Sequence, residues 1–99
     1  MPQAKQIEKH NHGGHRDRLR ERFVNAPDAL PDYEMLELLL FMAIPRKDVK
    51  PIAKDLINKY NDLNGVLNAS LNDLQSINGI SHNSAIAIRA IRAAGLRLL

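Results

Sequence analysis

The sequence predicts a single compact all-α domain, a bundle of five to six short helices. The chain has 99 residues, the size of one small domain, and its 44% hydrophobic and 25% charged content is typical of a soluble globular protein. From His15 onward the apolar residues recur with helical spacing. No stretch alternates between apolar and polar residues, and only 4% of the residues are aromatic, so strands are not expected.

The first part of the chain is expected to be an arm followed by a basic helix. Residues 1–14 are rich in Gln, Asn, Lys and Gly, which bury little, so we expect a flexible arm before a helical domain over residues 15–99. The first helix is predicted from about His15 to Val24. Leu19 and Phe23, four residues apart, give it one narrow apolar stripe.

The next two helices are predicted to form the centre of the core. One begins with Asp32 as its N-cap, and every residue in the range 38–44 is apolar, so we expect this helix to be buried on all sides. Pro45 ends it. The following helix has Asp48 as its predicted N-cap and Pro51 in its first turn, where a missing N–H costs little.

Three further helices are predicted from their capping residues. Asp62 is expected to cap a short helix over residues 63–68, and Ser70 one over residues 71–76. Ser81 is expected to cap the last helix, which runs to about Leu98.

The turn before this last helix has a distinctive spacing. Ile77-Asn78-Gly79-Ile80-Ser81, followed by three further residues and then Ala85, resembles the helix-hairpin-helix motif of DNA repair proteins. That resemblance implies that backbone N–H groups at the start of the second helix bind a phosphate, and such a contact reads no bases. Ser81 stands in place of the second glycine of the motif, and Asn83 in place of its usual lysine. The alternative is a plain corner between two helices.

A wider resemblance covers nearly all of residues 14–99. The segments GHRDRLRERF, DALPDYEMLELLLFMAIPRKDVKPIAKDLI and LNGVLNASLNDLQSINGI resemble, in order, the N-terminal domain of RadC-type proteins. The resemblance implies that a C-terminal domain of the JAB/MPN type, a zinc metallohydrolase-like fold, is paired with this one. That domain is absent from this chain. Any hydrolase activity of the family is expected in that domain, so no enzymatic activity is expected here.

Basic charge gathers in three places, although the net charge is only +3. The first helix alternates arginine with other residues, and the predicted turn at residues 44–48 is a candidate for a second, degenerate hairpin. The alternatives are a solvated helix face and a loop ended by proline. With the turn at Gly79, the candidate DNA-binding residues are Asn78, Gly79, Ile80, Ser81, Asn83, Arg89, Arg46, Lys47, Lys50, Arg16, Arg18, Arg20 and Arg22.

Several other classes of function are not indicated. The chain contains no cysteine, no Gly-rich nucleotide loop, no signal peptide and no apolar run of about 18 residues, so we expect a cytoplasmic protein without cofactors. His10, His12 and His15 lack the fourth ligand of a structural zinc site, so no metal site is expected. Two functions stay open: a DNA-binding module without sequence specificity, and a domain that positions a JAB-type partner and binds no DNA.

Overall fold

The structure, a computed structural model, describes residues 13–99. Within this range the chain forms six α-helices and one short 3-10 helix and contains no strand, which confirms the predicted all-α class. The elements in order are α2 (Gly13–Asn25), η1 (Pro27–Ala29), α3 (Asp32–Ala43), α4 (Lys50–Tyr60), α5 (Leu63–Asn68), α6 (Leu71–Gln75) and α7 (His82–Leu96). Residues 1–12 of the predicted arm lie outside the described part of the chain, and α2 begins at Gly13, two residues before the predicted start.

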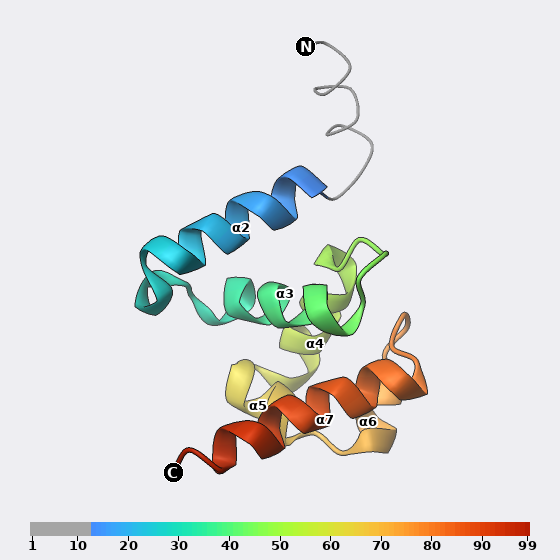
Figure 1. The fold of residues 1–99 in the computed structure, drawn as a ribbon. Helices are drawn as coiled ribbons and strands as arrows, with labels where there is room; N and C mark the ends of the chain where they lie inside the picture. Colours follow the sequence, from blue (N-terminus) through green and yellow to red (C-terminus); the bar gives the residue numbers. More distant parts are fainter. Residues whose placement is uncertain (1–12) are drawn as a thin grey trace.

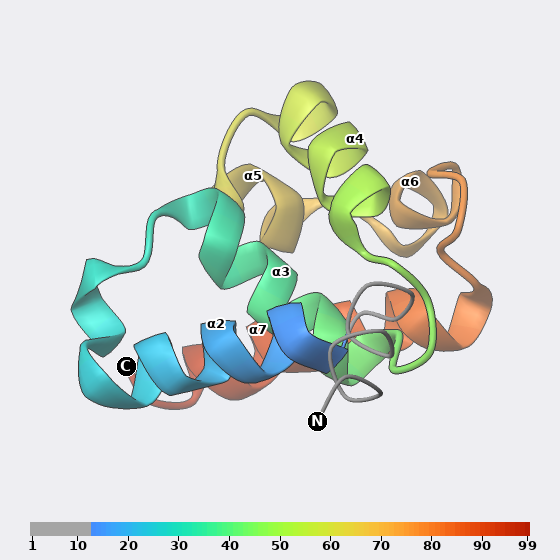
Figure 2. The ribbon, with the colours of Figure 1, turned by 90° about the horizontal axis from the view of Figure 1, so that it is seen from above.

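Helix α3 lies at the centre of the bundle. It packs on α2 on one side and on α7 on the other, and it also contacts α4 and α5 (Figure 1). Viewed from above, α2 crosses over α3 while α7 lies beneath it (Figure 2). No helix of residues 13–99 has the length and apolar character that crossing a bilayer requires.

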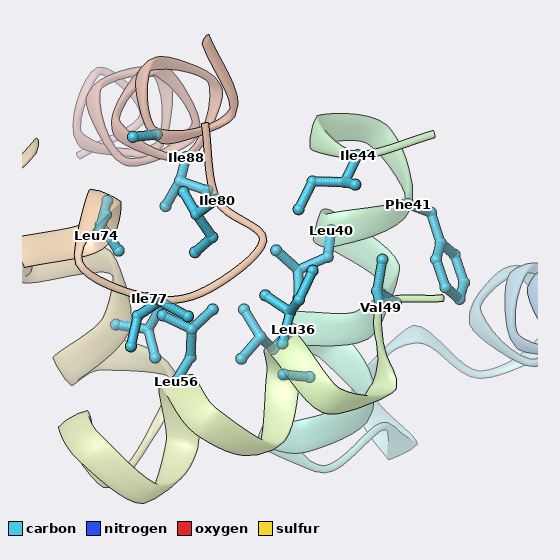
Figure 3. Packing of buried hydrophobic residues seen from close by; sticks show 14 of the residues in the cluster. Leu36, Leu40, Phe41, Ile44, Val49, Leu56, Leu74, Ile77, Ile80 and Ile88 are labelled. Carbon is cyan, nitrogen blue, oxygen red and sulfur yellow. The ribbon is translucent and has the colours of Figure 1, made fainter. Parts of the chain in front are cut away.

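The core forms where α3, α4, α6 and α7 meet. Leu36 and Leu40 of α3 face Leu56 of α4, and the turn between α6 and α7 inserts Ile80 toward the same region (Figure 3). Leu40 and Leu56 are fully buried, and Ile80 is 6% exposed. Burying such a side chain contributes about 1.5–3 kcal/mol, so the turn residue is part of what stabilises the bundle.

Two expectations about the core were wrong in part. Helix α3 is not buried on all sides, because Met42 near its end is 65% exposed, while the acidic Glu37 is 2% exposed. The helix is covered by α2, α4, α5 and α7 on some faces only, and Met42 lies on an uncovered one. The apolar stripe of α2 is anchored by Leu19 alone, since Phe23 is 36% exposed.

The predicted caps are largely confirmed. The Asp62 carboxylate accepts from the Gly65 N–H at 2.8 Å, Ser70 Oγ from the Asp73 N–H at 3.1 Å, and Ser81 Oγ from the Ser84 N–H at 3.1 Å. Each of these bonds satisfies one N–H group that a helix start leaves without a partner.

The two other predicted N-caps take different positions. Asp32 lies inside the first turn of α3, after Pro31, and its carboxylate accepts from the Leu63 N–H at 3.0 Å. It therefore ties the start of α5 to α3. Asp48 lies two residues before the first residue of α4, and its carboxylate accepts from the Lys50 N–H at 3.1 Å.

At the corner between α4 and α5, Gly65 lies directly against the backbone of Tyr60. Asn61 adopts a positive φ of 79°, so the chain reverses within two residues. A Cβ at Gly65 would overlap the carbonyl oxygen of Tyr60, which is backbone and cannot move aside. By contrast, a Cβ at Gly95 in α7 would meet no atom within 4 Å.

We therefore expect opposite effects from two identical substitutions. Gly65→Ala should lower the free energy of unfolding by about 3 kcal/mol or more, since a backbone overlap forces the corner open. Gly95→Ala should raise it by about 0.5–1 kcal/mol, because alanine loses less entropy than glycine in a helix. Urea unfolding of both variants measures the difference, and equal free energies would contradict the tight corner.

Candidate nucleic-acid interface

The turn between α6 and α7 is built around Gly79. This residue has a φ of 98°, which glycine adopts without strain, and the Ile80 N–H closes the turn onto the Ile77 carbonyl at 3.1 Å. Ile77 and Ile80 are both buried, and Ala85, which is fully buried, lets α7 approach its neighbours closely. The apolar residues of the hairpin-like sequence thus hold the turn from inside.

Gly79 also fixes where the turn lies relative to α4. A Cβ at this position would come within 2.8 Å of Ile52 Cδ1. The turn therefore rests on the first turn of α4, and any larger residue at Gly79 would disturb folding as well as a ligand contact. Asn78, Ser81 and Asn83 are exposed around it, whereas Ile80 is not available to a ligand.

The cap at Ser81 limits what the start of α7 offers. Its hydroxyl accepts the Ser84 N–H at 3.1 Å and lies 3.0 Å from the Ser84 hydroxyl. Ser84 Oγ in turn donates to the Ala43 carbonyl of α3 at 3.3 Å. One N–H at the start of α7 is therefore already bonded, while His82 and Asn83 in the same first turn stay exposed.

The turn between α3 and α4 lies at the same end of the molecule as the turn between α6 and α7 (Figures 1 and 2). It carries Arg46, Lys47 and Lys50, all three exposed. The two turns have a similar layout, since each is followed by a helix whose fourth residue is a fully buried alanine, Ala53 in α4 and Ala85 in α7. Positive charge at one turn and helix-start N–H groups at the other therefore share one end of the bundle.

Lys59 adds a basic group that the sequence did not indicate. Its ammonium donates to Ser76 Oγ at 3.0 Å, so it lies beside the start of the α6–α7 turn. The two residues are 17 positions apart, and no local pattern connects them. Only the packing of α4 along this turn brings the charge there.

Arg16 is not part of the exposed basic surface. It is 7% exposed, and its guanidinium donates to the carbonyls of Phe41 at 3.2 Å, Ile44 at 3.0 Å and Lys47 at 2.6 Å. It also lies over the Phe41 ring, 4.6 Å from the centroid. Burial, with Arg20 nearby, lowers the pKa of Arg16, and Asp48 partly offsets this.

Two other arginines are engaged within the fold. Arg89 donates to the carbonyls of Leu67 at 3.4 Å and Ala69 at 3.0 Å, at the end of α5. Arg22 forms a two-pronged ion pair with Glu34, with N–O distances of 2.6 and 2.8 Å. These contacts direct both guanidinium groups toward protein groups.

Arg18 and Arg20 remain on the exposed side of α2. Arg20 lies 3.3 Å from the Asp17 carboxylate and 5.7 Å from the Phe41 ring centroid. The far end of α2 points away from both turns (Figures 1 and 2). The basic side chains that sequence position or contact places at the two turns are those of Arg46, Lys47, Lys50 and Lys59.

A buried carboxylate between α2 and α3 escaped the sequence analysis. Glu37 lies 3.3 Å from His15 Nε2, and His15 packs edge-on against Phe41. Burial raises the pKa of Tyr33, and the neighbouring Glu37 raises it further. No group of three or more His, Cys, Asp or Glu side chains in residues 13–99 is placed to hold a metal ion, and His10 and His12 fall outside that range.

The sequence is similar to those of a known protein family. A family model described as UPF0758 N-terminal matches residues 12–86. A UPF0758 protein of Fusobacterium nucleatum subsp. nucleatum is 48% identical over 79 residues, which is 79% of this chain and 34% of the relative. The chain thus spans about a third of the length of the curated relative it matches. No solved structure matches.

The Arg22–Glu34 pair predicts a pH dependence of stability. Its hydrogen bonds lower the pKa of Glu34 below the ordinary value of 4.5. A lowered pKa in the folded state means that the pair stabilises the fold above pH 4.5 and loses this effect as the pH falls through the lowered pKa. The effect is small because Arg22 is solvent-exposed.

We expect Glu34→Gln to lower the melting temperature slightly at pH 7 and to differ less from the wild type at pH 3. Melting curves from pH 2.5 to 7 measure this, with Glu21→Gln on the exposed face of α2 as the control. A difference that stays constant across the range would show that the pair contributes nothing.

Proposed function

The chain belongs to the UPF0758 N-terminal family, and we propose that this domain is a DNA-binding module that contacts phosphate groups without reading base sequence. The observation that carries the proposal is the juxtaposition of two turns at one end of the bundle, linked where Gly79 rests on Ile52. The resemblance of the α6–α7 segment to a helix-hairpin-helix motif, and of the chain to RadC-type DNA repair proteins, points the same way.

The two turns would make different contributions to binding. The start of α7 offers backbone N–H groups at the positive end of a 15-residue helix. The α3–α4 turn offers the side chains of Arg46, Lys47 and Lys50, which supply most of the electrostatic attraction to a phosphate backbone. Neither contribution distinguishes one base from another, so binding is expected to be independent of sequence.

A second function is favoured by a different observation. Ser81 already binds one N–H of α7, Asn83 carries no charge, and Arg16, Arg22 and Arg89 are directed to protein groups. These features suit a domain that positions another part of a longer protein, such as the JAB-type domain that the RadC resemblance implies. We propose no catalytic role for the domain in either case.

Binding should weaken steeply with salt and should depend on the α3–α4 turn. Each phosphate contact on duplex DNA contributes a slope of about −0.9 in log K against log salt. Arg46→Gln should reduce the slope by about one. Arg97→Gln, the same change at an exposed site near the C-terminus and at the opposite end of the molecule, should leave it unchanged.

Fluorescence anisotropy with labelled duplex, single-stranded and branched DNA at several salt concentrations measures these slopes. Equal slopes for the two variants would remove the α3–α4 turn from the interface. Absence of binding by the wild type even at low salt would refute the DNA-binding function and leave the positioning function.

Ser81→Gly offers a test of the α6–α7 turn that spares Gly79. The substitution releases the Ser84 N–H and costs only a few tenths of a kcal/mol, because glycine is a tolerated N-cap. If α7 binds phosphate, DNA affinity should rise while the melting temperature falls slightly. A loss of affinity in a folded variant would show that the serine hydroxyl itself contributes to binding.

A further inference from the structure

We propose that Arg16 of α2 is a positioning residue that holds the α3–α4 turn in the conformation in which Arg46 and Lys47 face DNA. This inference rests on the proposed DNA-binding function. In this proposal α2 contributes to the interface without any contact between its exposed arginines and DNA. The helix would act through its one buried guanidinium.

The three carbonyls that Arg16 binds follow one another along the chain. Phe41 lies in the last turn of α3, Ile44 is its C-cap, and Lys47 lies in the turn itself. A clasp that only docked α2 onto α3 would need the first two. The bond to the Lys47 carbonyl, the shortest at 2.6 Å, extends the contact to the residue whose side chain is one of the exposed cations.

The turn is anchored at its two ends by the buried side chains of Ile44 and Val49, but few polar contacts hold the residues between them. Before it, the Ile44 N–H bonds to the Leu40 carbonyl, and after it, the Ala53 N–H bonds to the Val49 carbonyl. Between these points, the polar contacts found within residues 13–99 come from the side chains of Arg16 and Asp48. No glycine stands in residues 44–49.

The α6–α7 turn differs from the α3–α4 turn in how it is held. It is closed by its own backbone, through the Ile80 N–H to Ile77 bond, and by a glycine with positive φ. In the α3–α4 turn, the carbonyls of Ile44 and Lys47 are instead bonded by a side chain that lies 28 and 31 residues away in sequence. Two turns with similar positions are therefore fixed by different means.

The geometry requires arginine in particular. Its planar fork presents several N–H groups in fixed directions and stacks on an aromatic ring, here Phe41 at 4.6 Å. Lysine would place one ammonium where the arginine spans three carbonyls. Arg16→Lys therefore keeps the positive charge but cannot bond all three carbonyls. Its effect distinguishes a positioning role from a purely electrostatic one.

The test uses Arg16→Lys and Arg16→Gln, with Arg97→Gln as the control at an exposed site away from both turns. Backbone ¹⁵N order parameters of residues 46–50 should fall in both Arg16 variants and remain unchanged in residues 76–83. DNA affinity should fall about tenfold or more, with a salt slope smaller by about two, because two phosphate contacts are lost. Arg97→Gln should match the wild type in both measurements.

A combined variant makes the test specific. In a chain already carrying Arg46→Gln and Lys47→Gln, Arg16→Lys should cause no further loss of affinity, since the cations it positions are gone. An additive loss, or a wild-type salt slope and wild-type order parameters in Arg16→Lys, would overturn the proposal. If Arg16→Gln does not fold, Arg16→Lys carries both measurements.

Failure of the proposed function gives a different result. If the wild type binds no DNA, affinity cannot be compared between variants, and the order parameters of residues 46–50 alone decide whether Arg16 holds the turn. Lower order parameters there would establish a structural clasp and overturn its role in DNA contact.

Discussion

The carboxyl end of α3 is the junction on which the rest of the arrangement depends. A helix end leaves carbonyl groups without partners inside the helix. Here Arg16 of α2 binds the Phe41 and Ile44 carbonyls, and Ser84 of α7 binds the Ala43 carbonyl. The same few atoms therefore hold α2, α7 and the turn that leads to α4. A small domain has a modest core, so these polar contacts specify positions that apolar packing alone leaves open.

The parts of the fold that depend on local sequence could be predicted. Asp62, Ser70 and Ser81 cap helices because their side-chain oxygens lie three residues before an N–H group that needs a partner. Asp32 has the same local signal, yet its carboxylate bonds to Leu63, 31 residues away. Its true partner depends on where α5 packs, and no window of neighbouring residues contains that information.

The charge pattern was the least reliable guide to the candidate site. Arginines at alternating positions in α2 suggested one phosphate-binding surface, but helical geometry sends Arg16 into the interior and Arg22 toward Glu34. Glu37 has no His or Lys near it in sequence, but the packing of α2 on α3 buries it and brings His15 beside it. Lys59, which was not among the predicted site residues, lies beside the α6–α7 turn. In each case the partner comes from a distant segment.

The proposed function follows from how the two turns complement each other. A phosphate site needs donors in fixed positions and nearby positive charge. The α6–α7 turn has the fixed backbone but no cation of its own at Asn83, and its serine cap occupies one donor. The α3–α4 turn has the cations but no glycine, and Arg16 binds its Lys47 carbonyl. Because each turn lacks what the other has, binding would require both at once. Two contacts join the regions of the turns: Gly79 packs against Ile52, and Ser84 binds the Ala43 carbonyl.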